Sequence, residues 1–184
     1  MTAVPTARDA GVTGQQPRGR RVVVIPGAPV LLAQYASLTD PVPALRAACR
    51  EALDWLGDDV RVLADDAQGL RIAGELLGRT PSTSPDADVV VVANGSARRT
   101  EKAPGHLDDR AAAFDAHVGD MLDRGDLAGL AGLDHALATE LLTAGLGLFT
   151  TLADEGWVVQ GGGIDRAEDP FGVMYWVVRW QCAS

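Results

Sequence analysis

The sequence predicts an α/β fold with three layers, in which helices flank a largely parallel central sheet and a C-terminal antiparallel hairpin. Two continuous β-branched runs, at residues 22–25 and 89–92, are typical of strands buried on both faces of a parallel sheet. Segments with helical periodicity lie between and after them, and this alternation is typical of α/β proteins. At 184 residues, of which 47% are hydrophobic, the chain fits one domain with a sizeable core.

The first segment of the chain has no apolar face that could pack into a core. Residues 1–19 have no apolar periodicity, so we expect a flexible N-terminal tail before a single domain at 20–184. The basic residues before the apolar run 22–33 are also a feature of secretory signals. Pro26 and Gly27 interrupt that run, and a buried first strand explains it equally well. We therefore expect a cytoplasmic protein.

The first strand, expected at 21–25, leads into a predicted helix. Apolar residues at helical spacing extend over 42–56, and Gly57 closes the segment. Thr39 or Asp40 is expected to cap this helix, because short polar side chains accept hydrogen bonds from the first free N–H groups.

In the middle of the chain, a strand is again followed by a helix. A second strand is expected at 60–64, a short helix at 70–77, and a loop rich in proline and serine at 80–88. The clearest strand of the chain is then predicted at 89–93. Its all-aliphatic composition favours the centre of the sheet.

Helices are predicted after this strand. One apolar face extends over 109–123, and Asp134 is expected to cap a helix that continues to Leu142 and ends at Gly145. Residues 146–152 are expected to be helical too. The last elements are two strands, 157–159 and 172–180, predicted to pair as a hairpin around the turn-rich residues 161–163 and 169–170. The aromatic side chains of the second strand are expected in the core.

Charge and cysteine content exclude several function classes. A formal net charge of -9 disfavours binding to nucleic acids or anionic membranes, which requires a cationic surface. No apolar stretch is long enough to cross a bilayer. Cys49 and Cys182 are far apart and show no metal-binding spacing, so reduced thiols are expected.

The loop at 94–105 is the most distinctive candidate for a ligand site, because it follows the central strand, where α/β proteins bind ligands. Arg98, Arg99 and Lys102 can hold a carboxylate or phosphate, so we expect a small anionic or aromatic ligand. Asn94 and Ser96 complete the predicted substrate-binding set. The alternative is a solvated turn.

Proton transfer in this loop is assigned to Glu101 and His106 as candidate catalytic residues. A surface role for His106 is the competing interpretation. Asp65 and Asp66 can hold a cation, but adjacent side chains usually point apart and a polar strand exit explains them as well. The three histidines lack the spacing of a helical metal site, and no metal ligand or cofactor is predicted.

Three blocks of the sequence resemble a known family, the subunit-B-like branch of the class III extradiol ring-cleavage dioxygenases, as found in small actinobacterial proteins. The longest block is Asn94 to Asp108 with Arg110-Ala111-Ala112 and Phe114-Asp115. Leu133 to Gly145, and Asp169-Pro170-Phe171-Gly172-Val173 running into Tyr175 and Trp180, agree as well. In the N-terminal half, Ile25-Pro26-Gly27-Ala28-Pro29-Val30-Leu31-Leu32 is similar to the family's opening motif, with glycine in place of its histidine.

The resemblance implies ferrous iron held by two histidines and a carboxylate in the catalytic members. This chain departs from that pattern. Gly27 stands where one histidine is expected, Asp65 and Asp66 occupy the loop of a second, and Arg98 and Arg99 stand where catalytic relatives place an acid-base histidine. No iron ligand can be carried over, and iron is expected only if atypical ligands are used.

The sequence leaves three hypotheses for function. The first is a protein that does not cleave rings and acts as a small-molecule-binding or partner subunit, for which the resemblance implies a homodimer. The second is an enzyme of different, iron-independent chemistry, with an anionic substrate held by the 94–106 loop. The third is a metal-dependent dioxygenase with atypical ligands such as Asp65, Asp66 and His106.

Overall fold

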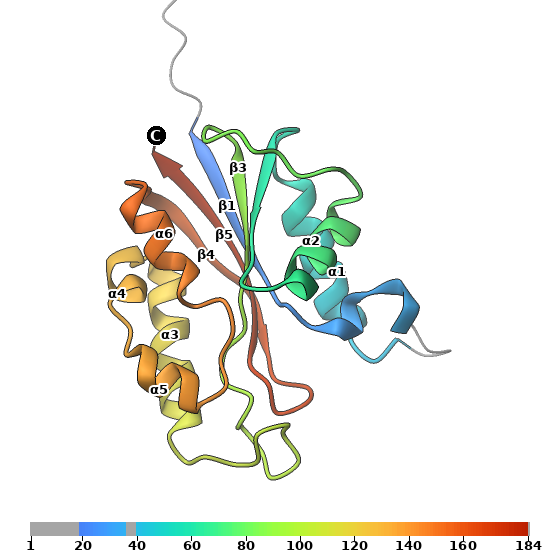
Figure 1. The fold of residues 1–184 in the computed structure, drawn as a ribbon, viewed down its shortest axis with the longest axis vertical. Helices are drawn as coiled ribbons and strands as arrows, with labels where there is room; N and C mark the ends of the chain where they lie inside the picture. Colours follow the sequence, from blue (N-terminus) through green and yellow to red (C-terminus); the bar gives the residue numbers. More distant parts are fainter. Residues whose placement is uncertain (1–18, 36–39, 184) are drawn as a thin grey trace, which may run out of the picture.

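The computed structural model describes residues 19–35 and 40–183. Within these ranges, five strands form one mixed sheet in the order β2-β3-β1-β5-β4. Helices cover both faces of the sheet, which gives the predicted three layers (Figure 1). The first 18 residues of the predicted tail, and Thr39 as a predicted helix cap, lie outside the described residues.

The three parallel strands were predicted correctly. They are β1 (Arg20–Ile25), β2 (Val60–Leu63) and β3 (Asp88–Val92), with β3 paired to both of the others. The side chains of residues 22–25 and 89–92 are at most 5% exposed. Because both faces of the sheet are covered at these residues, the two runs are continuously apolar instead of alternating.

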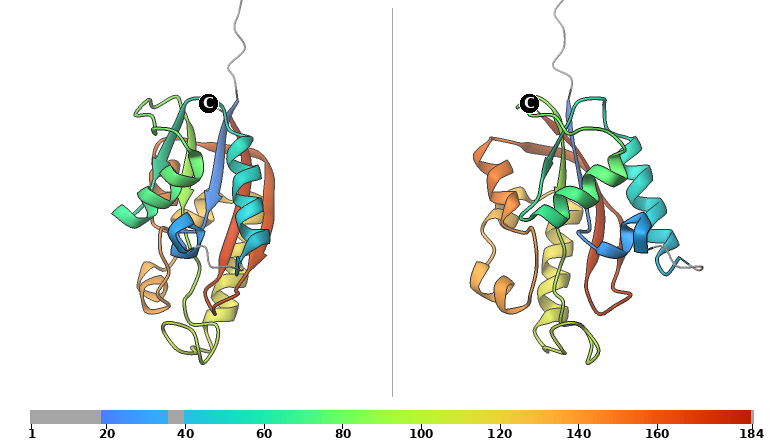
Figure 2. Two further views of the ribbon diagram at one scale, coloured as in Figure 1. Left: turned by 90° about the vertical axis from the view of Figure 1, so that its right-hand side faces the viewer. Right: turned by 45° about the vertical axis from the view of Figure 1, so that its right-hand side comes forward.

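Helices α1 (Pro43–Asp54) and α2 (Ala67–Leu77) cover one face of the sheet (Figure 2). The N-cap of α1 is Val42, and Asp40 contributes by accepting the Val42 N–H at 3.0 Å. Helix α2 begins three residues earlier than predicted because Asp66 caps it. It ends at a left-handed glycine, as predicted.

The opposite face carries four helices. They are α3 (Ala111–Arg124), α4 (Leu127–Ala131), α5 (His135–Glu140) and α6 (Leu148–Asp154). The five-residue helix α4 was not predicted. Helix α5 stops short of its predicted end, because Leu142 adopts a left-handed φ of 57° and Ala144 pairs with Asn94 in an isolated bridge.

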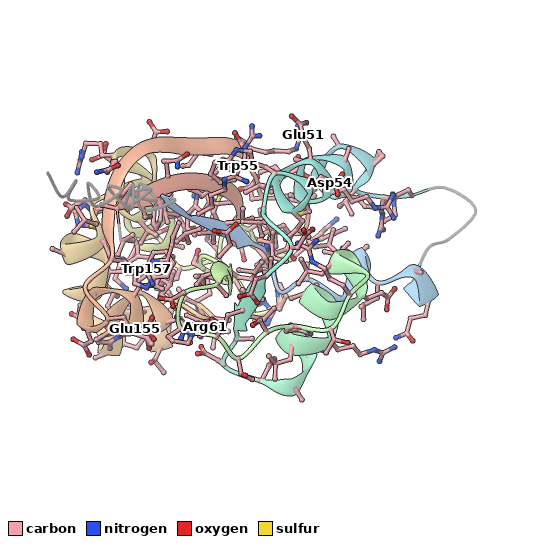
Figure 3. All side chains as sticks on the ribbon, turned by 90° about the horizontal axis from the view of Figure 1, so that it is seen from above. Glu51, Asp54, Trp55, Arg61, Glu155 and Trp157 are labelled. Carbon is pink, nitrogen blue, oxygen red and sulfur yellow. The ribbon has the colours of Figure 1, made fainter. Side chains whose placement is uncertain are left out.

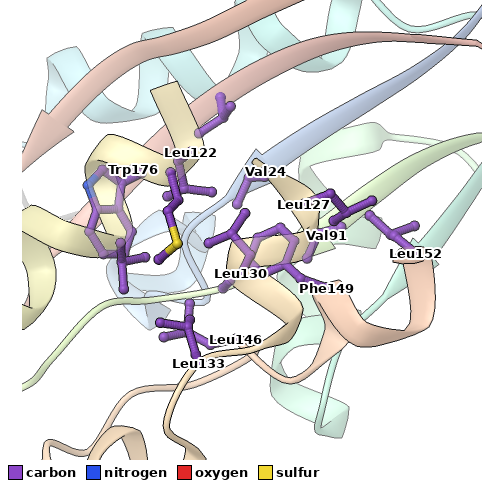
Figure 4. Close-up of a cluster of buried hydrophobic side chains, with 14 of the residues drawn as sticks. Val24, Val91, Leu122, Leu127, Leu130, Leu133, Leu146, Phe149, Leu152 and Trp176 are labelled. Atoms are coloured by element: carbon purple, nitrogen blue, oxygen red, sulfur yellow. The ribbon is translucent and has the colours of Figure 1, made fainter. Parts of the chain in front are cut away.

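The larger core lies between these four helices and the sheet (Figure 4). Trp176 and Trp180 of β5 are at most 1% exposed, which confirms that the aromatic residues of the last strand belong to the core. The Trp180 ring lies 5.9 Å from that of Phe149 in α6, and its indole N–H donates to the Leu122 carbonyl at 2.9 Å. A second core, under α1 and α2, contains Cys49, whose pKa is raised to about 12 by burial.

The hairpin is longer than predicted, and the prediction of a turn at residues 161–163 was wrong. Strand β4 (Val158–Glu168) continues through the three glycines and pairs with β5 (Tyr175–Ala183) over its whole length. The chain reverses near Gly172, which has a φ of 71°. Two irregularities in the β4–β5 register, one next to Gly161, allow the glycines to remain inside the strand.

At the amino-terminal ends of the parallel strands, a polar cluster joins β2 to the segment before β4. Figure 3 labels its members, Arg61, Glu155 and Trp157, side by side. Arg61 forms two hydrogen bonds with Glu155, one of them at 2.8 Å, and the Trp157 indole N–H donates to the same carboxylate at 3.0 Å. The Arg61 guanidinium therefore lowers the pKa of Glu155. No helix of the described residues is long and apolar enough to span a bilayer.

Candidate functional site

The carboxyl ends of the three parallel strands meet around a small pocket of about 100 Å³. Gly27 follows β1, Asp65 and Asp66 follow β2, and Asn94 follows β3, and all four line this pocket. Ligands of open α/β sheets bind at this edge. The fold therefore brings together the beginnings of the three loops that the sequence singles out.

Side-chain oxygens of the pocket accept hydrogen bonds from backbone N–H groups. Gly27 donates to Asn94 Oδ1 at 2.9 Å, and Gly145 donates to Asp65 Oδ2 at 2.7 Å. Asp66 caps helix α2 in a similar way. These bonds hold the loops together, so both aspartates have a structural role at the strand exit.

The family's iron site can be compared with the residues that line this pocket. Position 27 has no side chain, and a Cβ added there would lie 3.1 Å from Val92 Cγ1. The remaining polar groups are two aspartates, a glutamine and an asparagine, and none of the chain's histidines lines the pocket. The described residues also contain no group of three or more histidine, cysteine or acidic side chains arranged to bind a metal. These side chains do not fit two imidazoles and a carboxylate around iron.

The histidines lie elsewhere on the surface. His117 and His135 are exposed on α3 and at the start of α5. His106 is exposed with a left-handed φ of 58°, and its Nδ1 lies 3.3 Å from the Glu101 carbonyl oxygen. The structure therefore does not place His106 with the aspartates among the residues that line the strand-end pocket.

Ser96 is a buried structural residue. Its backbone N–H donates to Asp115 Oδ1 at 2.8 Å, and its hydroxyl donates to Asp115 Oδ2 at 2.5 Å. Ser96 is 0% exposed, so it is out of reach of a ligand in solution. Gly95 is required beside it, because an added Cβ would lie 2.6 Å from the Trp176 ring.

The two arginines of the loop differ in their surroundings. The Arg99 Nε donates to Asp169 Oδ2 at 2.8 Å, and its Nη1 lies 3.5 Å from Asp115 Oδ2. Arg98 is half-buried, and its Nε has no hydrogen-bond partner among the described residues. The guanidinium of Arg99 is therefore already paired with two carboxylates, whereas that of Arg98 forms no ion pair in the described part of the chain.

A groove of about 500 Å³ lies beside this loop. Its first wall contains Thr100, Glu101 and Lys102, and its second wall is the hairpin turn from Asp169 to Gly172. Lys102 and Glu101 are exposed, and Phe171 of the second wall is 43% exposed. The groove is therefore lined by a cation and a carboxylate on its first wall and by an aromatic ring on its second wall.

Asp115 is the most buried acidic side chain of this region, at 2% exposure. Burial raises the pKa of its carboxyl above the ordinary value, and this effect outweighs the hydrogen bonds from Ser96 and the positive charge of Arg99, which lower it. Burial therefore makes the ionised form of Asp115 less favourable than in water, and the contacts with Ser96 and Arg99 offset part of that cost.

Fold and site together define a three-layer α/β protein with a small polar pocket at the strand ends and a larger groove beside the loop after β3. No model of a known protein family matches this chain, and a comparison with curated proteins finds no match.

Sequence reasoning missed three residues of this region. Phe171, which provides the exposed ring of the groove, and Asp169, which binds Arg99, come from a turn 70 residues further along the chain than the loop. Asp115 left a detectable signal, because it is an acidic residue on the apolar face of a predicted helix. Such a position usually means a buried partner.

Proposed function

We propose that this chain is a small-molecule-binding protein with an extradiol-dioxygenase-like fold and without ring-cleavage chemistry. The groove between the 94–106 loop and the hairpin turn is the observation that carries the proposal. Its volume, about 500 Å³, is in the range typical of small-molecule sites. Assembly as a homodimer or with a partner subunit is compatible with this role.

The chemistry of the groove favours a small ligand that is anionic, aromatic or both. Lys102 is the only lysine of the chain, and every ion pair of the described residues uses arginine. Asp169 is neutralised by Arg99, so the ammonium of Lys102 is available to a ligand. The ring of Phe171 supplies an apolar surface on the facing wall.

We propose that the protein does not cleave rings because the residues at the strand ends offer few atoms that could bind iron. Gly27 provides no ligand atom, and the Asp65 and Asn94 oxygens accept backbone hydrogen bonds. Ring cleavage would need iron with open coordination positions. Oxygen uptake by the iron-supplemented protein with catechol, above that of free iron, would contradict this part of the proposal.

Benzoate is a suitable probe, because it combines a carboxylate with an aromatic ring. Reductive ¹³C-methylation labels the amine of Lys102 and the terminal amino group, so the Lys102 signal reports on the groove. We expect benzoate to shift this signal in a saturable way. We expect neutral benzamide to bind about five- to tenfold more weakly, as for the loss of one charge-assisted contact near solvent.

Two variants test whether the ammonium is responsible. Lys102→Gln should weaken benzoate binding about five- to tenfold and leave benzamide binding unchanged, measured by chemical-shift titration of the ¹⁵N-labelled protein. Arg50→Gln removes the same charge from an exposed position on α1 and serves as the control. Equal benzoate affinity in the wild type and in Lys102→Gln, or no binding of either probe, would reject the groove as the ligand site.

A second candidate function is an enzyme of iron-independent chemistry on an anionic substrate. Glu101 favours it, because this exposed carboxylate lines the groove next to Lys102. His106 lies on the same loop, although it does not line the groove. Chemical conversion of a bound ligand that is lost in Glu101→Gln, while binding is kept, would distinguish this function from binding alone.

A further inference from the structure

The structure assigns a positioning role to Arg99, which sets the distance between the two walls of the groove and does not bind the ligand itself. This inference rests on the proposed function. It differs from the simplest interpretation of the loop, in which adjacent arginines hold an anion directly. The contacts of Arg99 with the hairpin turn and with α3 support this role.

Arg99 binds the second wall with both its backbone and its side chain. Its N–H donates to the Gly172 carbonyl at 3.1 Å, and its Nε donates to Asp169 Oδ2 at 2.8 Å. The two walls are in close contact at this point, because a Cβ added to Gly172 would lie 2.6 Å from Thr100 Oγ1 and 2.7 Å from Ala103 Cβ. A shift of the turn therefore changes the shape of the groove directly.

The same guanidinium is also anchored to the helix layer. Its Nη1 lies 3.5 Å from Asp115 Oδ2, and Asp115 is fixed on α3 by two hydrogen bonds from Ser96. Arg99 therefore connects three parts of the fold, which are its own loop, the β4–β5 turn and α3. Because two carboxylates already share its positive charge, the side chain attracts a ligand anion less strongly than an unpaired cation does.

The geometry requires a guanidinium. A planar fork can hold two carboxylates from different elements at once, whereas an ammonium is a compact charge on a flexible stem. Arg99→Lys is therefore expected to behave like Arg99→Gln and to leave the turn loosely held. Preorganised walls lower the cost of ordering a site when a ligand binds, and this is how Arg99 would act on affinity.

Two probes distinguish positioning from direct contact. If Arg99 positions the walls, Arg99→Lys should weaken benzoate and benzamide by the same factor, about tenfold, since both probes lose the same preorganised groove while the positive charge beside Asp169 is kept. Arg99→Gln should weaken both probes too, and benzoate more than benzamide, because it leaves the Asp169 carboxylate of the groove without its cation. If Arg99 binds the carboxylate, the variants should weaken benzoate alone, as expected for Lys102→Gln. Arg50→Gln is again the control, because it removes the same charge from an exposed position on α1, away from the groove. Loss of benzoate binding alone in Arg99→Lys, or no loss for either probe, would overturn the inference.

Hydrogen exchange tests the inference even if neither probe binds the wild type, a result that would reject only the groove as the ligand site. In Arg99→Gln, exchange should accelerate at the backbone amide of position 99, which in the wild type donates to Gly172, and at that of Met174, which donates to Ser96. The amides of β1 should keep their protection, because the sheet does not depend on this contact. Unchanged protection of the backbone amides at position 99 and at Met174 would mean that the turn is held without the guanidinium, which would contradict the inference.

Discussion

Replacement of Asp115 by alanine is expected to lower the free energy of unfolding by about 3 kcal/mol. The substitution removes the acceptor of the Ser96 N–H and hydroxyl, and it leaves this N–H buried without a partner. Arg99 loses one of its two carboxylates, but its side chain is 25% exposed, so water compensates part of that loss. Urea denaturation followed by circular dichroism measures the difference.

Asp120→Ala is the matched control on the same helix. Asp120 is exposed and pairs only with Arg124, four residues later, so its loss should cost about 0.5 kcal/mol or less. Similar destabilisation by the two substitutions would mean that the buried carboxylate has no special role in holding the loop.

Asp115→Asn tests the pH dependence of the same site. The pKa of Asp115 is raised above 3.8 chiefly by burial, so the folded protein keeps this proton at a pH where the unfolded chain has lost it. The contribution of the protonated Asp115 carboxyl to the free energy of unfolding is therefore fully present below pH 3.8. It is lost as the pH rises through the pKa of Asp115 in the folded protein. Because asparagine does not titrate, the stability lost in the variant should be smaller at about pH 7 than at about pH 4. A larger loss at neutral pH would contradict the sign of the shift.

The parallel half of the fold could be predicted because its signals are local and physically unambiguous. Strand segments buried on both faces must be apolar at every position, and residues 22–25 of β1 and 89–92 of β3 satisfy this requirement without interruption. Glycine ended α2 as predicted because the left-handed φ of Gly78 suits a residue without a Cβ. Helix α4 was missed because five residues are too few to establish a helical period.

The candidate site was less predictable, because contacts between distant segments decide it. Arg98 and Arg99 are adjacent and chemically identical, yet Arg99 is paired with Asp115 and Asp169 and Arg98 is not. Ser96 appeared to be a ligand-binding residue by its position after a strand, but it is buried under the loop. In both cases the partner lies more than 15 residues away, so no local pattern reveals it.

The strand-end pocket and the groove beside the loop after β3 differ in size and in the chemical groups that line them. The resemblance places iron chemistry at the strand ends, where the pocket has about 100 Å³ and its oxygens serve backbone N–H groups. The cation and the aromatic ring lie instead in the groove of about 500 Å³. This difference supports the proposal of binding without ring cleavage, because the groove has room for a small ligand and lies away from the strand ends, where the resemblance would place iron.

Gly162 is expected to tolerate replacement by alanine far less well than its neighbour Gly161 does. Gly162 has a φ of 108°, and an added Cβ would lie 2.0 Å from the Arg179 carbonyl oxygen across the β4–β5 ladder. We expect Gly162→Ala to cost about 3 kcal/mol, because the strand must either adopt a strained backbone or move away from β5. Urea denaturation provides the measurement.

Gly161 provides an internal control, because a Cβ added there would meet nothing within 4 Å and its φ is outside the left-handed region. Gly161→Ala should be neutral or raise stability by about 0.5 kcal/mol, since alanine restricts the unfolded chain more than glycine does. This contrast follows from a continuous strand. If residues 161–163 formed a flexible turn instead, the two substitutions would have similar effects, and equal stabilities of the two variants would refute the paired register of β4 and β5.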